Sequence, residues 1–522
     1  MAIATMSSRV LGMVREMVYY SFMGTGWVND AFQFAFTIPN LFRRLLGEGA
    51  LTAAFIPVFK EKEKLDGEAE MWRAANAVIS GLIISASVII ALVMAGLSLA
   101  LAVHGFSEKT TLILELLRVM FPYMLLVCLA AAMMGMLNAR GHFFIPAMGA
   151  AMLNVVMIAS VLWLAPRFGR GLPRDQQLPV QIFALAYGVL AAGVAQAAFQ
   201  MPTLWRDGFR YHWVSPWGNP TVRRVVRQMI PGTVGVAAFQ INVALVQMVA
   251  VHVGTGILAS FNGAVRLMEL PQGMFGISLA TYLLPTLAGL AAEKNYPEFR
   301  STLRQGLGSL IFINAIASVL LTVLAVPIVR LLFERGEFSA SSTLRVAGAL
   351  AYLAPGLVMF SAVNILARAF YALGDTRTPM KISLVCLVIN FLGGSVLIYV
   401  LQERGPGLAN TLTSTLNAGL LLFALRKKLA RLELRSLLQT LPLLAATALL
   451  AGGLAWGGWR LWDRELGHAS LALKLGAVFV PAGLAGTLYW GVALAAKIPA
   501  AREMSEFALA KFKRKRSQPA GK

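Results

Sequence analysis

Residues 74–107 read AANAVISGLIISASVIIALVMAGLSLALAVHGFS and contain no Asp, Glu, Lys or Arg. A bilayer core about 30 Å thick needs about 20 apolar residues of helix, so this stretch is long enough to cross a membrane. Eleven further charge-free runs meet the same requirement, at 119–139, 141–166, 176–205, 228–265, 270–292, 305–329, 346–367, 382–402, 405–425, 436–459 and 475–496. They are too long and too uniformly apolar for the strands of about ten alternating residues in a membrane β-barrel. The sequence therefore predicts an all-α polytopic membrane protein.

The first 60 residues predict two more membrane helices, over 2–24 and 30–59, which are apolar but carry charges. The run 228–265 is long enough for one helix and the start of the next, which continues through Arg266 into 270–292. These additions predict fourteen transmembrane helices. Because fourteen is even, we expect both termini on the same side of the membrane.

The composition excludes several classes of protein. Of the 522 residues, 58% are hydrophobic and 13% are charged, whereas a soluble chain carries about 25% charged residues. An ordinary cytoplasmic enzyme and a disordered chain are therefore excluded. Cys128 and Cys386 both lie in apolar runs and form no CxxC motif, so no metal site or disulfide framework is expected. The chain has neither GxxxxGK[ST] nor HExxH, and we expect no cofactor.

The net charge of +22 is explained by the distribution of Lys and Arg over the loops. With both termini in the cytoplasm, 29 of the 46 basic residues lie on the cytoplasmic side and 11 on the opposite side. Basic loops stay in the cytoplasm, so this orientation is predicted. The basic rim then faces anionic lipid. Because no soluble domain is present to bind nucleic acid, no nucleic-acid partner is expected.

Prolines and glycines repeat along the chain at an offset of 232–233 residues. The corresponding pairs are Pro39 with Pro271, Pro122 with Pro355, Gly141 with Gly374 and Pro146 with Pro379. The repeat matches helices 1–6 to helices 7–12 in parallel orientation, which is a transporter design with the substrate path between two six-helix lobes related by a pseudo-twofold axis. The predicted parts are an N-lobe at 1–215, a C-lobe at 216–432, helices 13 and 14 at 433–497, and a basic cytoplasmic tail at 498–522.

Charged residues inside the predicted spans gather in helices 1, 2 and 8. A charge at bilayer depth costs roughly 2.5–3.5 kcal/mol, so it needs a partner or a cavity. The set is Arg9, Arg15, Asp30, Arg43, Arg44, Glu48, Arg266 and Glu269. Five arginines against three carboxylates leave a surplus of positive charge. A guanidinium binds carboxylate or phosphate through two parallel hydrogen bonds. We therefore predict a central polar cavity for an anionic ligand, most plausibly phosphate or pyrophosphate.

Several of these residues have a purely structural alternative. Arg44 and Glu48 lie four residues apart and can neutralise each other on one helix face. Arg9 is close enough to the N-terminus to reach the cytoplasmic interface. Glu269 follows Arg266 by one turn and can be its ion-pair partner rather than a ligand.

Two blocks of sequence carry a family resemblance. The first combines SRVLG at 8–12 with Arg15, NDAF at 29–32, IPNLFRR at 38–44, GEGA at 47–50 and AFIP at 54–57. The second is RLMELPQG at 266–273, followed by Leu-Pro at 284–285. Together with the helix count and the repeat, these blocks resemble the MurJ/MviN family of lipid II flippases along nearly the whole chain.

The resemblance implies the MOP exporter fold and a flippase in the cytoplasmic (inner) membrane. Its substrate would be lipid II, the undecaprenyl-pyrophosphate-linked peptidoglycan precursor, moved from the inner to the outer leaflet by alternating access. In that family, arginines of helices 1, 2 and 8 line the cavity, an aspartate near the start of helix 2 is required, and helices 13 and 14 hold the lipid tail. The matching substrate-binding positions are Arg9, Arg15, Asp30, Arg43 and Arg266, with Arg44, Glu48 and Glu269 as supporting residues. By its position after the Gly24–Gly26 break, Asp30 is also predicted to cap helix 2.

Two other functions are considered. One is export of a different lipid-linked oligosaccharide. The other is an integral membrane enzyme acting on polyprenyl phosphates, which would need catalytic carboxylates, histidines or a metal; the five histidines are far apart in the sequence. We therefore predict a transporter and not an enzyme. Its expected partners are the lipid II head group and membrane lipids, and interaction with cell-wall synthesis proteins is left open.

Overall fold

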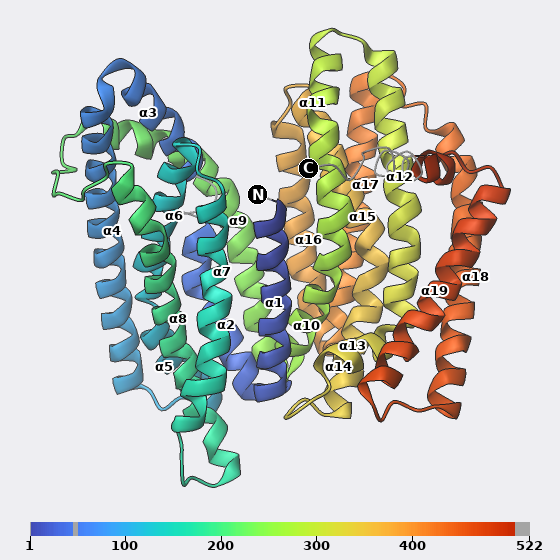
Figure 1. Ribbon diagram of the computed structural model, residues 1–522, viewed down its shortest axis with the longest axis horizontal. Helices are drawn as coiled ribbons and strands as arrows, with labels where there is room; N and C mark the ends of the chain where they lie inside the picture. The colour runs from blue at the N-terminus through green and yellow to red at the C-terminus, as the bar shows by residue number, and fades with distance from the viewer. Residues whose placement is uncertain (1, 45–50, 507–522) are drawn as a thin grey trace, which may run out of the picture. The chain divides into compact units, whose positions relative to one another are not determined.

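The computed structural model describes residues 2–44 and 51–506. Every regular element in this part of the chain is a helix, so the predicted all-α class is confirmed. Figure 1 shows the helices, which fall into two compact units. Unit 1 comprises Met1–Ala259 together with Arg335–Phe338, and unit 2 comprises Ser260–Glu334 and Ser339–Lys522.

Unit 1 is built from the first nine α-helices. They are α1 (Ala2–Met23), α2 (Trp27–Phe42), α3 (Leu51–Leu65), α4 (Gly67–Val103), α5 (Glu108–Met120), α6 (Tyr123–Ala139), α7 (Phe144–Ala159), α8 (Arg174–Arg206) and α9 (Pro220–Val253). Helix α8 packs against α6 and α7, α1 packs against α7, and α2 packs against α5. Phe59, Met71 and Met136 lie in a buried apolar cluster that joins α3, α4 and α6.

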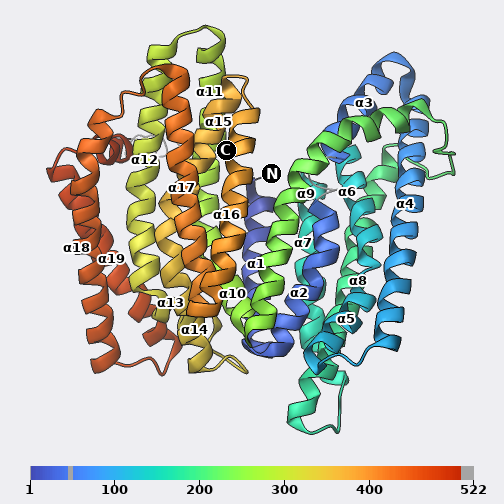
Figure 2. The same cartoon turned by 180° about the vertical axis from the view of Figure 1, so that it is seen from behind.

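Unit 2 contains most of α10 and the remaining helices. They are α10 (Ile257–Pro271), α11 (Ser278–Ala292), α12 (Tyr296–Val323), α13 (Ala325–Phe333), α14 (Ala340–Leu353), α15 (Leu357–Ala372), α16 (Arg377–Leu401), α17 (Arg404–Leu429), α18 (Arg435–Glu465) and α19 (Leu471–Ala495). Helices α16 and α17 pack as one pair and α18 and α19 as another, as the view from behind in Figure 2 also shows. Leu310, Leu366 and Leu421 lie in its buried core.

Among the described residues, ten helices are long and apolar enough to cross a membrane, or eleven if α5 and α6, bent by 43°, form one span. The predicted count of fourteen is not confirmed. The predicted spans outside this set are short or carry charges. Helix α1 contains Arg9, Arg15 and Glu16, and α2 has 16 residues. In α9, Phe239–Val253 qualifies only as a shorter apolar helix among the described residues.

The helix predicted over 30–59 is represented by α2 and α3, with residues 45–50 outside the described part. Two other predicted helices are interrupted in the structure. The run 346–367 is divided by Pro355 into α14 and α15, and Pro122 similarly separates α5 from α6. Proline has no backbone N–H to continue a helix, which accounts for both breaks. Since Pro122 and Pro355 are related by the repeat offset, the two interruptions are counterparts.

The division into compact units lies later in the chain than the predicted lobe boundary at 215. Helix α9 packs against α2, α3 and α4 and therefore belongs to unit 1. The lobes were defined by the sequence repeat, which is a different criterion from contact density, so the predicted boundaries at 215, 432 and 497 stay predictions.

Candidate substrate-binding site

Arg15 is held inside unit 1 by contacts to α7 and to its own helix. Its Nη1 donates to Asn154 Oδ1 at 3.0 Å, and its Nη2 lies 2.5 Å from Glu16 Oε1. The guanidinium also lies 5.5 Å from the centre of the Tyr19 ring. The Arg15 side chain is only 12% exposed. Because a charge in an apolar environment needs compensation, Glu16 and Asn154 explain how α1 tolerates this arginine.

Sequence reasoning did not include Glu16 among the charged residues of the site. The signal was present, since Glu16 directly follows Arg15 in an apolar helix. Asn154, by contrast, lies 139 residues from Arg15. Local sequence did not link these two residues.

The other arginines predicted in helices 1 and 2 differ in their exposure to solvent. Arg9 is exposed on α1. Arg43 donates from Nε to Asn40 Oδ1 at 2.8 Å, and Arg44 is half-buried. The predicted Arg44–Glu48 pair falls outside the described residues, because Glu48 does.

Asp30 caps a helix, but not the helix that was predicted. Helix α2 begins at Trp27 after Gly26, with no side-chain cap. The buried Asp30 carboxylate instead accepts hydrogen bonds from the backbone N–H groups of Gly256 at 2.5 Å and Ala259 at 2.8 Å. These N–H groups lie at the start of α10, where a helix leaves its first donors unsatisfied. The prediction of a local cap on helix 2 was wrong because the acceptor serves a distant helix end.

Lys109 completes the polar cluster at the break between α9 and α10. Its Nζ donates to the carbonyls of Val251 at 2.5 Å and Gly254 at 3.3 Å, and it lies 3.6 Å from Asp30 Oδ2. A cation therefore meets the carbonyl end of α9 and an anion meets the N–H end of α10, as the helix dipoles favour. We call Asp30 and Lys109 the break clamp. Lys109 was not among the candidate residues predicted from the sequence.

The end of α1 packs beside this clamp within unit 1. The Tyr20 hydroxyl donates to Ala259 O at 2.7 Å, and its ring meets that of Phe338 edge to face, with centroids 5.4 Å apart. The backbone N–H of Glu337 donates to Ser21 O at 2.8 Å. The start of α10 is thus fixed by both side-chain and backbone contacts.

Arg266 lies in unit 2 and forms an ion pair with Glu269. The Nη1–Oε2 distance is 2.9 Å, and the two side chains are 43% and 49% exposed. The pairing suggested as an alternative by the sequence is therefore present. Exposed ion pairs of this kind contribute about 0–1 kcal/mol to stability. Pro271 ends α10, and a π-helical segment follows at Gln272–Ile277.

At one rim of unit 1, ion pairs connect α3 to its neighbours. Arg224 of α9 donates from Nη1 and Nη2 to the two carboxylate oxygens of Glu61, both at 2.7 Å. This double hydrogen bond lowers the pKa of Glu61 from its ordinary value. Lys60, and then Arg140, lower the pKa of Glu63 in the same way. Some of the basic residues counted in the sequence therefore link neighbouring helices through ion pairs.

Within the described residues, no three His, Cys, Asp or Glu side chains gather closely enough to hold a metal ion. The prediction that no metal or cofactor is needed is not tested by this observation and stays a prediction.

Ten or more helices of the described chain are long and apolar enough to cross a membrane, and charged side chains such as Glu16 and Asp30 are buried among the helices. These features are typical of a multi-pass membrane protein of the transporter class. A model of the family "Lipid II flippase MurJ" matches residues 20–476, and the chain belongs to this family. The resemblance predicted from the sequence blocks is confirmed.

Relatives support the assignment along most of the chain. A lipid II flippase MurJ of Burkholderia cenocepacia is 32% identical, covering 87% of this chain and 88% of its own. A probable lipid II flippase MurJ of Rhizobium tropici is 33% identical, covering 94% and 92%. The family and the apolar helices identify a multi-pass protein of the bacterial inner membrane.

Solved structures show the same fold. The inward closed conformation of a lipid II flippase MurJ matches with a TM-score of 0.74 at 19% identity, covering 94% of this chain and 99% of that one. An inward-facing multidrug resistance MATE family transporter of the MOP superfamily matches with a TM-score of 0.65 at 16% identity, covering 83% and 99%. The expected MOP exporter fold is confirmed.

Proposed function

We propose that this chain moves lipid II from the inner to the outer leaflet of the membrane by alternating access. The observation that carries the proposal is the family match over residues 20–476, supported by one relative named lipid II flippase MurJ and one named probable lipid II flippase MurJ. The chemistry agrees, since arginines in apolar helices offer the planar donors that a pyrophosphate requires.

Arg9, Arg15, Arg43 and Arg266 are proposed to replace the water lost by the pyrophosphate head group. Arg15 enters this role already bonded to Glu16 and Asn154, so its position is set before the ligand arrives. Arg266 exchanges its exposed bond with Glu269 for the phosphate. An inside-negative potential favours outward movement of the anionic head, by about 2.3 kcal/mol per charge per 100 mV.

The break clamp is proposed to set the starting direction of α10, which carries Arg266 seven residues beyond Ala259. Asp30 then acts on transport without touching the substrate, by satisfying the first N–H groups of that helix. Lys109 holds the preceding carbonyl end of α9. A change of state in the transport cycle would have to break or rearrange these bonds.

The remaining proposals concern orientation and the lipid tail. Both termini face the cytoplasm, as the excess of basic residues on that side favours. Helices α18 and α19, which pack as a pair, guide the polyprenyl tail while the head group moves through the protein. The protein transports without chemical change of its cargo, and contacts with cell-wall synthesis proteins are a further possibility for its partners.

The proposal is tested with purified protein in vesicles that contain fluorescently labelled lipid II in the inner leaflet. Wild type is expected to deliver label to the outer leaflet. Arg266→Gln is expected to lower the rate at least about tenfold, and Arg266→Lys to recover only part of it, because lysine lacks the planar fork. Arg464→Gln, which removes an exposed charge on α18, is the matched control and should transport normally.

Full activity of Arg266→Lys would contradict recognition through paired guanidinium donors. Faster movement of a different polyprenyl-pyrophosphate oligosaccharide than of lipid II would favour the exporter alternative. Cleaved or transferred product in the same vesicles would instead favour an enzyme.

The break clamp is tested separately with Lys109→Met and Lys109→Arg. We expect Lys109→Met to lower transport and Lys109→Arg to restore most of it, since arginine keeps a cationic donor near the α9 carbonyls. Lys64→Met is the control, because Lys64 lies at the exposed end of α3. Equal rates for Lys109→Met and wild type would remove Lys109 from the mechanism.

A further inference from the structure

The end of α8 and the loop between α8 and α9 expose aromatic side chains that the proposed transport reaction does not use. Trp205, Tyr211, Trp213 and Trp217 are between 47% and 74% exposed. We call residues 205–217 the aromatic loop. Tryptophan and tyrosine combine a large apolar surface with one polar group, so a cluster of them is better placed at an apolar–polar boundary than in water.

The backbone of the aromatic loop is fastened to α4. Asn76 is buried and donates from Nδ2 to Arg210 O at 3.0 Å, and Ser80 Oγ lies 3.4 Å from the backbone N of Val214. The buried Phe209 ring packs against Trp72, with centroids 5.5 Å apart. The four exposed aromatic side chains therefore lie on a segment whose backbone is held in place by contacts with α4.

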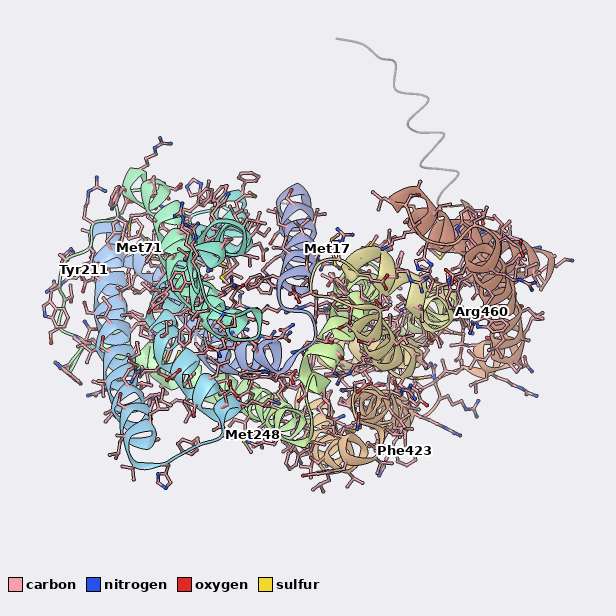
Figure 3. The ribbon with its side chains drawn as sticks, turned by 90° about the horizontal axis from the view of Figure 1, so that it is seen from below. Met17, Met71, Tyr211, Met248, Phe423 and Arg460 are labelled. Carbon is pink, nitrogen blue, oxygen red and sulfur yellow. The ribbon has the colours of Figure 1, made fainter. Side chains whose placement is uncertain are left out.

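The attachment points place the loop at the depth where α4 enters the membrane. Helix α4 is free of Asp, Glu, Lys and Arg from residue 74 onward, and Asn76 and Ser80 lie in the first turns of that apolar part. Leu92 and Leu99, further along, are 69% and 65% exposed, as expected of a lipid-facing flank. Figure 3 shows Tyr211 at the outer margin of unit 1, on the same side as α4. Trp and Tyr concentrate at this boundary in membrane proteins.

The charges around the aromatic loop are mainly basic. Arg206 and Arg223 are exposed on its two flanks, and Asp207 is the only acidic residue between 205 and 227. Asp207 is already engaged by His142, at 3.0 Å. Basic side chains near the membrane surface attract anionic lipids. Each such residue contributes about 1 kcal/mol, which raises the local concentration of anionic lipid several-fold.

We propose that the aromatic loop is a binding surface for anionic phospholipid head groups. Trp213 and Trp217 insert at the level of the head groups, and Arg206 and Arg223 contact the lipid phosphates. A lipid occupant fits better than a protein partner, because the loop lies along the flank of a helix whose adjoining surface is apolar and exposed. This inference goes beyond the proposed transport function and does not depend on it.

The test uses the full-length protein in nanodiscs that contain brominated phosphatidylglycerol or brominated phosphatidylcholine, with total lipid charge kept equal. Bromine quenches nearby tryptophan fluorescence. The signal of the loop is obtained by subtracting the spectrum of the Trp213→Phe/Trp217→Phe variant from that of the wild type. We expect both lipids to quench this signal, and the brominated phosphatidylglycerol to quench it at least about twofold more, given the basic residues nearby.

The charge-removing variant Arg206→Gln/Arg223→Gln is expected to abolish the stronger quenching by brominated phosphatidylglycerol. Both brominated lipids should still quench the signal of the loop. The control Arg170→Gln/Arg464→Gln removes two exposed charges that lie elsewhere in the chain, and it should keep the preference. A difference signal that neither lipid quenches would overturn the membrane placement and point to water or a protein partner. Equal quenching of the wild-type signal by both lipids would overturn recognition of anionic head groups.

Discussion

The turn after α6 in unit 1 and the turn after α15 in unit 2 have the same backbone but carry different side chains. Gly141 and Gly374, related by the repeat, take φ values of +88° and +73°. The next residue donates its N–H to the carbonyl five positions back in both turns, from His142 to Leu137 and from Asp375 to Phe370, each at 2.9 Å. Such a helix ending requires a left-handed residue, which glycine adopts without strain.

The side chains that follow these glycines differ. In unit 1, His142 pairs with Asp207 at the end of α8. In unit 2, Asp375 takes the equivalent place, accepts from Lys428 of α17 at 2.7 Å, and also accepts from the Thr378 backbone N–H at 3.0 Å. The repeat has therefore kept the geometry of the turn and its link to a neighbouring helix end, while the carboxylate lies on the neighbouring helix end in unit 1 and on the turn itself in unit 2.

The largest effect is expected where the two turns are alike. Gly141→Ala and Gly374→Ala should each lower the free energy of unfolding by about 1–2 kcal/mol, the strain of a left-handed alanine. A Cβ at either position would have open space around it, so strain is the only cost and the two values should agree. Thermal melting of the detergent-solubilised protein measures both. Clearly unequal shifts would show that the two turns are not equivalent.

A smaller effect is expected from Asp375→Asn, which weakens the contact with Lys428 and the bonds to Thr378. Asparagine keeps an acceptor for the Thr378 N–H, and removal of the charge costs at most about 1 kcal/mol. Lys428→Met removes only the ion pair, so its melting temperature should fall less than that of Asp375→Asn. Equal shifts would assign the whole effect to the ion pair.

Of the two turns, the one in unit 2 should show the stronger acid response. The hydrogen bond from Lys428, followed by that from the Thr378 backbone, lowers the pKa of Asp375. A carboxyl with a lowered folded-state pKa contributes stability above its unfolded value, about 3.9, and loses it as the pH falls through the folded value. Asp375→Asn should therefore flatten the melting profile below about pH 4. An unchanged acid profile would mean that this carboxyl is not coupled to unfolding.

The smallest effect is expected at His142. Its contact with Asp207 is an ion pair only when the imidazole is protonated, and the His142 side chain is 42% exposed. His142→Gln should change the free energy of unfolding by less than about 0.5 kcal/mol, as for most exposed positions. A loss as large as that of Asp375→Asn would erase the contrast between the two turns.

Predictions from the sequence succeeded where a local pattern has only one physical solution. Long charge-free runs form membrane helices, and a glycine followed by a proline marks a helix boundary, as at Gly141–Pro146 and Gly374–Pro379. The count of fourteen spans was less secure, since α1, α2 and α9 combine apolar residues with charges or are short. The sequence assigned the cap of Asp30 to helix 2, whereas its carboxylate accepts from the first N–H groups of α10.

The sequence by itself determined the helical membrane class, the internal repeat and the family, because hydropathy, helix breaks and motif spacing are all local along the chain. Only the tertiary structure decided how the buried charges are compensated. The carboxylate of Asp30 meets a helix start 226 residues away, and Arg15 meets Asn154 at a separation of 139. An apolar interior forces every charge to find a partner, but which partner it finds depends on how the helices pack.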